Sequence, residues 1–167
     1  MNKVLVSLLI ASVSSLGVAY AKVPPKPIAA NVIKVHSQYA RAVPPGQPNG
    51  AVFMTLVNTT STPWSVKSAS SPAAKVTELH ITQNHNGVMQ MHQVSKIDLP
   101  AAGEVVLKPG SLHMMLIGLK QDLKVGEKTS VTLTFSDNSQ LKLDVPIQEV
   151  TQPMNNNHSG HSEHHMH

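Results

Sequence analysis

Residues 130–145 read SVTLTFSDNSQLKLDV, and this stretch indicates the fold class. Val131, Leu133 and Phe135 alternate with threonines, and beyond the Asp-Asn turn apolar residues again occupy every second position. Successive side chains of a β-strand point to opposite faces of the sheet. The period of two therefore predicts a hairpin with one buried face on each strand.

Short segments of the same kind recur along the chain, separated by turns rich in Pro, Gly and Asn. No window of helical length has an apolar stripe with a period of 3.6 residues. We therefore predict an all-β fold, an antiparallel β-barrel or sandwich. The expected strands are residues 31–39, 51–58, 64–68, 75–81, 87–94, 104–107, 112–117, 130–135 and 140–145.

The two ends of the 167-residue chain differ from this strand-rich region. Residues 1–21 contain a lysine, an apolar run and a small-residue end, which is typical of a signal peptide. Residues 22–29 form a proline-rich lead-in, residues 30–150 the expected folded domain, and residues 151–167 a polar, flexible tail. We expect a protein exported to the periplasm, without stable insertion into a membrane.

The composition excludes several classes of function. The chain has no cysteine, ten His and eight Met, and only 13% of its residues are charged. Lack of cysteine excludes disulfides, zinc–thiolate sites, iron–sulfur clusters and blue-copper centres. The formal net charge of +4 is spread along the chain, which argues against binding to nucleic acid. The high number of imidazole and thioether groups is the feature of the composition that points to a function.

These groups recur at strand spacing. His113 and Met115 share one face of a predicted strand, with Cα atoms about 7 Å apart. His80 lies near the end of an earlier strand, and Met89 and Met91 share a face of the strand that returns. Thioethers are soft donors that favour Cu(I), and imidazole tolerates copper in either oxidation state. Two strand pairs can thus offer two His and two Met to one ion.

The spacing of these donors resembles the signature of the periplasmic PCu(A)C copper chaperones. His80 is followed by ten residues and Met91, then by twenty-one residues, His113, one residue and Met115. The matching motifs are YARAVPPG at 39–46, GAVFMTL at 50–56, SSPAA at 70–74, GVMQM at 87–91, LKPGSLHMML at 107–116 and GLKQ at 118–121.

This resemblance implies a cupredoxin-like β-barrel that is not an enzyme. It implies that His80, Met91, His113 and Met115 bind Cu(I), with Met89 as the alternative to Met91. It also implies delivery of copper to cytochrome oxidase assembly, through an acceptor such as an oxidase subunit or a thioredoxin-like assembly factor. We expect the protein to act as a monomer.

Two other functions compete with that of a copper chaperone. A copper storage or buffering protein would use the same donors without delivering the ion. A copper-dependent enzyme would use His80 and His113 at an open metal position. Thioethers support water activation poorly, and the sequence has no serine-elbow, paired-acid or nucleotide-loop motif.

The other noteworthy residues of the predicted domain are not expected to bind the ion directly. Glu78 shares a strand face with His80, so it either orients that imidazole or is an exposed carboxylate. Met54 and Met114 are expected in the core. The remaining histidines of the predicted domain, expected in solvent, are His36, His85 and His92.

The tail contains a second group of potential metal ligands. They are His158, His161, His164, His165, Met166 and His167. An expression tag is one explanation, but Ser, Gly, Glu and Met interrupt the histidines. We predict an auxiliary Cu(II) site, because flexible imidazole-rich segments suit that ion.

Overall fold

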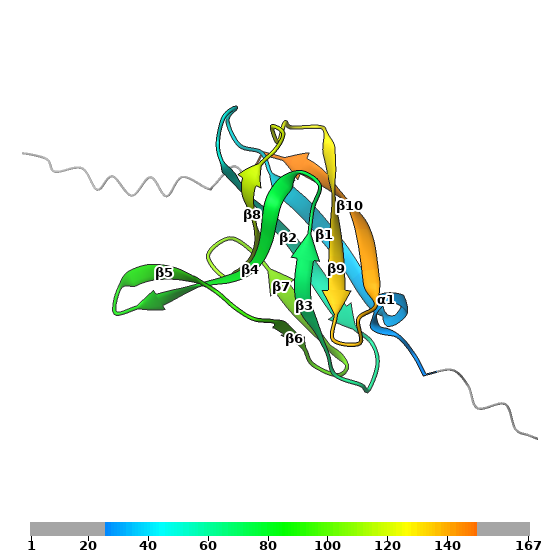
Figure 1. Ribbon diagram of the computed structural model, residues 1–167. Coiled ribbons are helices and arrows are strands. Elements are labelled where there is room, and N and C mark those ends of the chain that lie inside the picture. Colours follow the sequence, from blue (N-terminus) through cyan, green and yellow to red (C-terminus); the bar gives the residue numbers. More distant parts are fainter. Residues whose placement is uncertain (1–25, 150–167) are drawn as a thin grey trace, which may run out of the picture.

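The structure is a computed structural model that describes residues 26–149. The predicted signal peptide and the His-rich tail lie outside the described residues. The described residues form one short helix and ten strands (Figure 1). In chain order they are α1 (Ala29–Val32), β1 (Ile33–Arg41), β2 (Asn49–Asn58), β3 (Trp64–Ser70), β4 (Ala74–His85), β5 (Val88–Gln93), β6 (Ile97–Leu99), β7 (Gly103–Leu107), β8 (Leu112–Leu119), β9 (Lys128–Phe135) and β10 (Gln140–Gln148).

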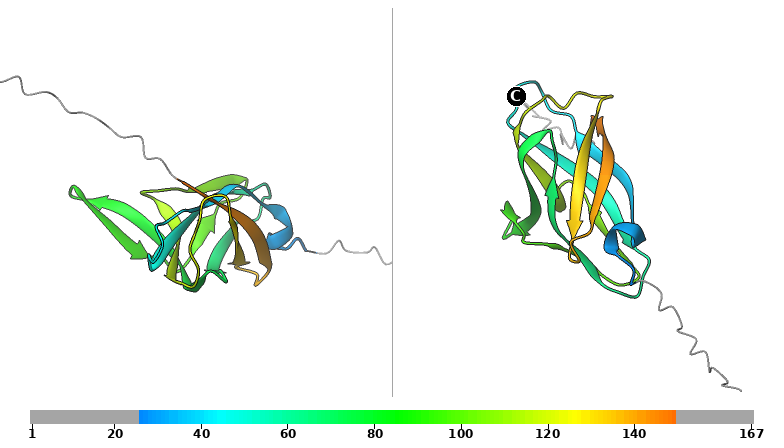
Figure 2. Two further views of the ribbon diagram at one scale, coloured as in Figure 1. Left: turned by 90° about the horizontal axis from the view of Figure 1, so that it is seen from above. Right: turned by 45° about the vertical axis from the view of Figure 1, so that its right-hand side comes forward.

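The strands pair in the order β5-β4-β8-β2-β1-β10-β9-β3-β6, with β7 added to β2. The sheet curls, so that β3 contacts β4 and β6 contacts both β2 and β7 (Figure 2). The predicted all-β class is confirmed. Of the pairings between described strands, that of β1 with β10 is parallel and the others are antiparallel.

The core lies between the two halves of the curled sheet. Val131, Leu133 and Phe135 of β9 are fully buried, as their alternation predicts. On β10 the burial is graded, because Leu141 and Leu143 are half-buried whereas the later Val145 and Ile147 are buried. The sequence pattern therefore identified the inward face correctly but not the depth of each residue.

The helix α1 begins at Ala29, the last residue of the predicted lead-in, and replaces the first two residues of the predicted strand 31–39, so that β1 begins at Ile33. It is held by the turn between β9 and β10. The Ala29 amide donates a hydrogen bond of 2.8 Å to Asp137 Oδ2. Partial burial raises the pKa of Asp137, but hydrogen bonds from Ser139 and from the Ala29 amide outweigh it, so the pKa lies below its ordinary value. Between residues 26 and 149 no helix is long and apolar enough to cross a membrane.

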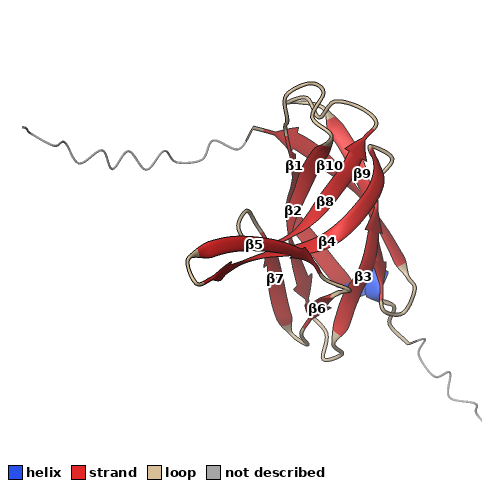
Figure 3. Ribbon diagram, turned by 60° about the vertical axis from the view of Figure 1, so that its left-hand side comes forward, coloured by secondary structure: helices blue, strands red, loops and turns tan. Residues whose placement is uncertain are grey.

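The hairpin of β4 and β5 projects from the body of the fold (Figures 1 and 3). β4 runs to His85, beyond its predicted end at Ile81. The last three residues of β4 and all six residues of β5 are exposed. The outer half of the hairpin therefore has no buried face that an apolar pattern would reveal. The three-residue strand β6 was not predicted, because it is too short to show a period.

Candidate metal site

Strand register places the four predicted donors on one face of the sheet. His80 of β4 and His113 of β8 are direct partners across the two strands. Met115 follows His113 by two residues and stands opposite Glu78. On the other side of β4, Met91 of β5 stands opposite the position two residues beyond His80. Because alternate residues of a strand share a face, all four side chains leave the sheet on the same side.

His113 is held in one tautomer by the loop before β8. The residue is only 6% exposed, and its Nδ1 lies 2.9 Å from the carbonyl oxygen of Ser111. A carbonyl can only accept a hydrogen bond, so Nδ1 carries the proton and the neutral ring keeps its lone pair on Nε2. The same carbonyl accepts the Thr82 amide of β4, which ties the loop to the hairpin.

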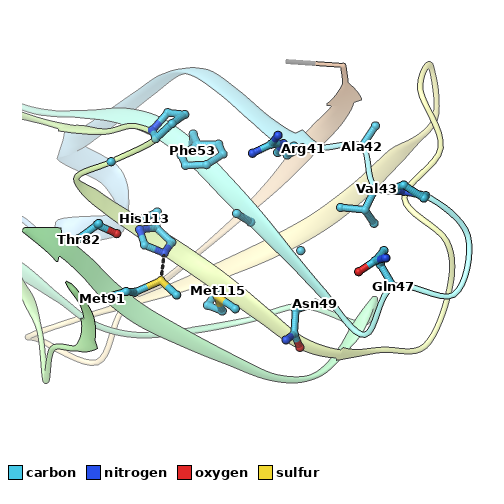
Figure 4. A pocket seen from close by; sticks show the side chains of 15 residues that line it. Arg41, Ala42, Val43, Gln47, Asn49, Phe53, Thr82, Met91, His113 and Met115 are labelled. Atoms are coloured by element: carbon cyan, nitrogen blue, oxygen red, sulfur yellow. Dashed lines mark hydrogen bonds between the residues drawn. The ribbon is translucent and has the colours of Figure 1, made fainter. Parts of the chain in front are cut away.

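The free nitrogen of His113 faces a thioether. Nε2 of His113 lies 3.2 Å from Sδ of Met91 (Figure 4). Both atoms are lone-pair donors in the neutral state, so neither supplies the other with a proton. For an ion such as zinc, bonds of about 2.0 Å to nitrogen and about 2.3 Å to sulfur place tetrahedral ligands about 3.5 Å apart. The observed pair is therefore close to the spacing of two ligands of one ion.

His80 presents a second free nitrogen. Its Nε2 lies 2.8 Å from Oε2 of Glu78, and a carboxylate accepts, so Nε2 carries the proton. Its Nδ1 is buried and has no hydrogen-bond partner among the described residues. A buried nitrogen without a partner is unfavourable, and a metal ion on Nδ1 would satisfy it. Of the two readings of Glu78, the structure therefore shows the one in which it orients His80.

Met91, His113 and Met115 line an open cavity of about 480 Å³ (Figure 4). Its other walls come from the segment after β1, the beginning of β2 and the Pro109-Gly110 turn. Met91 is 51% exposed, whereas Met115 is half-buried. The donors are therefore reachable from solvent on the side of the thioethers.

The other residues named from sequence lie apart from this arrangement. Met89 stands opposite Asn84, two residues nearer the hairpin tip than Met91, and does not line the cavity. Met54 and Met114 are buried in the core, as predicted. The three histidines predicted in solvent are exposed, namely His36, His85 and His92. The donors predicted in the tail lie outside the described residues.

Sequence reasoning missed three residues that shape the site. Ser111 sets the tautomer of His113, Phe53 packs against its ring with centroids 6.3 Å apart, and Arg41 lines the cavity. All three lie in quoted motifs, but no local pattern joins them. Within residues 26–149 no group of three His, Asp or Glu side chains is placed to hold a metal ion. A site built around His80 and His113 from these described residues therefore has to include the thioethers.

Residues 33–147 match the protein family described as "Putative lipoprotein LpqE-like". A relative from Leifsonia xyli subsp. xyli, named "Putative lipoprotein Lxx21020", is 36% identical over 132 residues, which are 78% of each chain.

The solved structures that are similar to the chain include a copper-bound domain and a Cu(I)-bound protein. The copper-bound PCuAC domain from PmoF2 is 22% identical, with a TM-score of 0.62, and the match covers 74% of this chain and 97% of that domain. At this identity the likeness concerns the fold. The Cu(I) form of DR1885 from Deinococcus radiodurans is 31% identical, with a TM-score of 0.55, over 73% of this chain and 80% of that protein.

Proposed function

The chain belongs to the LpqE-like family, and from this premise we propose that it is a copper chaperone that carries Cu(I) and passes it to an acceptor protein. Its ligands are His80, Met91, His113 and Met115. The observation that carries the proposal is the 3.2 Å approach of His113 Nε2 to Met91 Sδ, together with the unpartnered Nδ1 of His80, whose ring centroid lies 5.9 Å from that of His113. The likeness to a Cu(I)-bound protein at 31% identity supports it.

The chemistry of the donors selects the ion. Two thioethers and two imidazoles are neutral and soft to borderline, which suits Cu(I) and disfavours Mg²⁺, Ca²⁺ and Zn²⁺. The nearby carboxylate of Glu78 is already engaged by the proton of His80. Because thioethers bind poorly to the ions that activate water, this ligand set favours carriage of the ion over hydrolysis.

The ligands differ in how easily they release the ion. His113 is buried and held by Ser111, whereas Met91 is half-exposed on the projecting hairpin. In ligand exchange, an incoming group displaces the most accessible ligand first. Met91 therefore leaves first and His113 last. We propose export to the periplasm through residues 1–21, and an oxidase subunit or a thioredoxin-like assembly factor as acceptor.

X-ray absorption on the Cu(I)-loaded full chain tests this ligand set. We expect two sulfur and two nitrogen neighbours, since the four side chains share one face of the sheet. The Met91→Leu variant should lose one sulfur. A first shell without sulfur would refute the proposal.

Glu78 is proposed as a positioning residue for His80. We expect Glu78→Ala to lower the Cu(I) affinity about tenfold or more, because the partner that keeps the proton on Nε2 is gone. Glu78→Gln, whose amide oxygen still accepts that proton, should lose less. Competition with a Cu(I) chelator measures the affinity, and nitrogen NMR of the His80 ring reports the tautomer.

The control for this experiment is Glu104→Gln, an exposed carboxylate on β7. It should change neither the affinity nor the tautomer. An alanine variant of Glu78 with the tautomer and affinity of the wild type would contradict the positioning role.

We also propose that the tail supplies an auxiliary Cu(II) site, formed by His158, His161, His164, His165, Met166 and His167. Deleting residues 155–167 should lower the amount of Cu(II) bound per chain, while the Cu(I) affinity of the domain changes by no more than about twofold, because the four proposed Cu(I) ligands lie outside the deleted segment. Equilibrium dialysis with each ion measures both. A tail of the same length with asparagines in place of the histidines is the control, and unchanged Cu(II) binding would discard the idea.

A further inference from the structure

The cavity beside the metal ligands has one charged side chain on its walls. Arg41 is the only Lys, Arg, Asp or Glu among its fifteen lining residues. It forms no ion pair with a described residue. Figure 4 shows its side chain directed toward Phe53, on the side of the cavity across from Met91. The walls therefore present an uncompensated positive charge to whatever enters.

Strand register explains why Arg41 is there. Tyr39 of β1 stands opposite Phe53 of β2, and Arg41 follows two residues later on the same strand. Arg41 thus leaves the sheet on the face that carries Phe53 and the metal ligands. The segment after β1 and the start of β2 form the adjoining walls. The position of the guanidinium is set by the sheet, although the side chain itself is exposed.

A fixed cation at this place is unfavourable for holding Cu(I) and favourable for attracting an anion. The carboxylate near the site, Glu78, contacts His80 and does not line the cavity. The negative group therefore lies against His80, outside the cavity lining, and the positive group lies on the cavity wall. An anionic ligand that enters the cavity is attracted by Arg41, which lies across the cavity from Met91.

We propose that this cavity is the docking site for the copper ligand of the acceptor, and that this ligand is anionic, a cysteine thiolate on a protruding segment. This inference rests on the proposed function. In the exchange step the bond from copper to Met91 Sδ breaks and a bond from copper to the thiolate forms. Copper remains Cu(I), so no electron is transferred. Arg41 draws the thiolate in and is a positioning residue for the exchange.

Two small Cu(I) chelators with the same ligand atoms but different charges show whether the charge of the incoming ligand affects removal of the ion, apart from its access to the site. Bathocuproine disulfonate is anionic and neocuproine is uncharged. The full chain is loaded with Cu(I) under anaerobic conditions, and stopped-flow absorbance follows removal of the ion by each. We expect Arg41→Gln to slow removal by the anionic chelator about fivefold at low salt, and to leave removal by the neutral one within about twofold. Added salt should reduce the difference, because it screens the charge.

Two further variants test whether the effect depends on the positive charge and on its position in the chain. Arg41→Lys retains the charge and should keep most of the rate with the anionic chelator. Lys34→Gln removes an exposed charge from the other end of β1 and should behave as the wild type. Equilibrium Cu(I) affinity should be unchanged or slightly higher in Arg41→Gln.

The outcomes distinguish the two proposals. Equal slowing with both chelators, no slowing with either, or the same slowing in Lys34→Gln would overturn the role of Arg41 while leaving Cu(I) carriage intact. A wild-type chain that takes up no Cu(I) would overturn the proposed function and this inference with it.

Discussion

Replacing Met91 and Met115 together by leucine should lower the Cu(I) affinity of the full chain by about three orders of magnitude. Loss of a group that merely orients a ligand already weakens metal binding about 10- to 100-fold, and the variant removes two ligands. The two imidazoles that remain are less selective for the soft ion. Competition with a Cu(I) chelator of known affinity measures the loss.

The fold should tolerate this double change. Met91 is 51% exposed and Met115 is half-buried, and leucine has a similar volume. Thermal unfolding of the metal-free variant should therefore resemble that of the wild type. Met89→Leu is the matched control on the same strand face, and it should keep the affinity. Loss of affinity in Met89→Leu, with Met91→Leu unaffected, would move the ligand to Met89.

Alanine variants of the adjacent residues Met114 and Met115 should have opposite effects on stability and on Cu(I) affinity. Met114 is fully buried in the core, and we expect Met114→Ala to lower the free energy of unfolding by about 2–5 kcal/mol. Its Cu(I) affinity, measured at a temperature where the variant is folded, should change little. Met115→Ala should do the opposite, with an affinity about 100-fold lower and a stability change of about 1 kcal/mol or less.

This pair of variants tests the register of β8 directly. A shift of one residue in a strand moves every side chain to the other face of the sheet. If Met114→Ala lost copper and Met115→Ala lost stability, the register that pairs His80 with His113 would be wrong. Denaturant titration and chelator competition on the same preparations decide between the two outcomes.

The site combines a rigid part with an accessible part. His113 lies against Phe53, and its proton is held by Ser111, so one ligand is oriented before any ion arrives. Met91 is carried by a hairpin that projects from the body, and its strand β5 is at the edge of the sheet formed by the described residues. A carrier needs both properties. An oriented ligand increases the affinity for the ion, and an exposed ligand can be displaced by a ligand of the acceptor.

Much of this arrangement follows from local patterns. Alternation along 130–145 predicted the last hairpin, and the same period placed His113 with Met115 on one face and Met114 on the other. Spacing also separated Met91 from His92, which lies on the opposite face of β5 and is exposed. These predictions succeed because the two-residue period of a strand is a property of the backbone, independent of which neighbour the strand acquires.

Local patterns could not show which strands become neighbours. Pairing of β4 with β8 sets His80 opposite His113, and pairing of β1 with β2 brings Arg41 to the cavity. The hydrogen bonds of Glu78 and Ser111, which choose the tautomers, likewise depend on the folded chain. Strand order is set by hydrogen bonding and packing between segments far apart in sequence. The sequence therefore specifies the donors and the face each one occupies, whereas their convergence, tautomers and surrounding charge arise when the sheet closes.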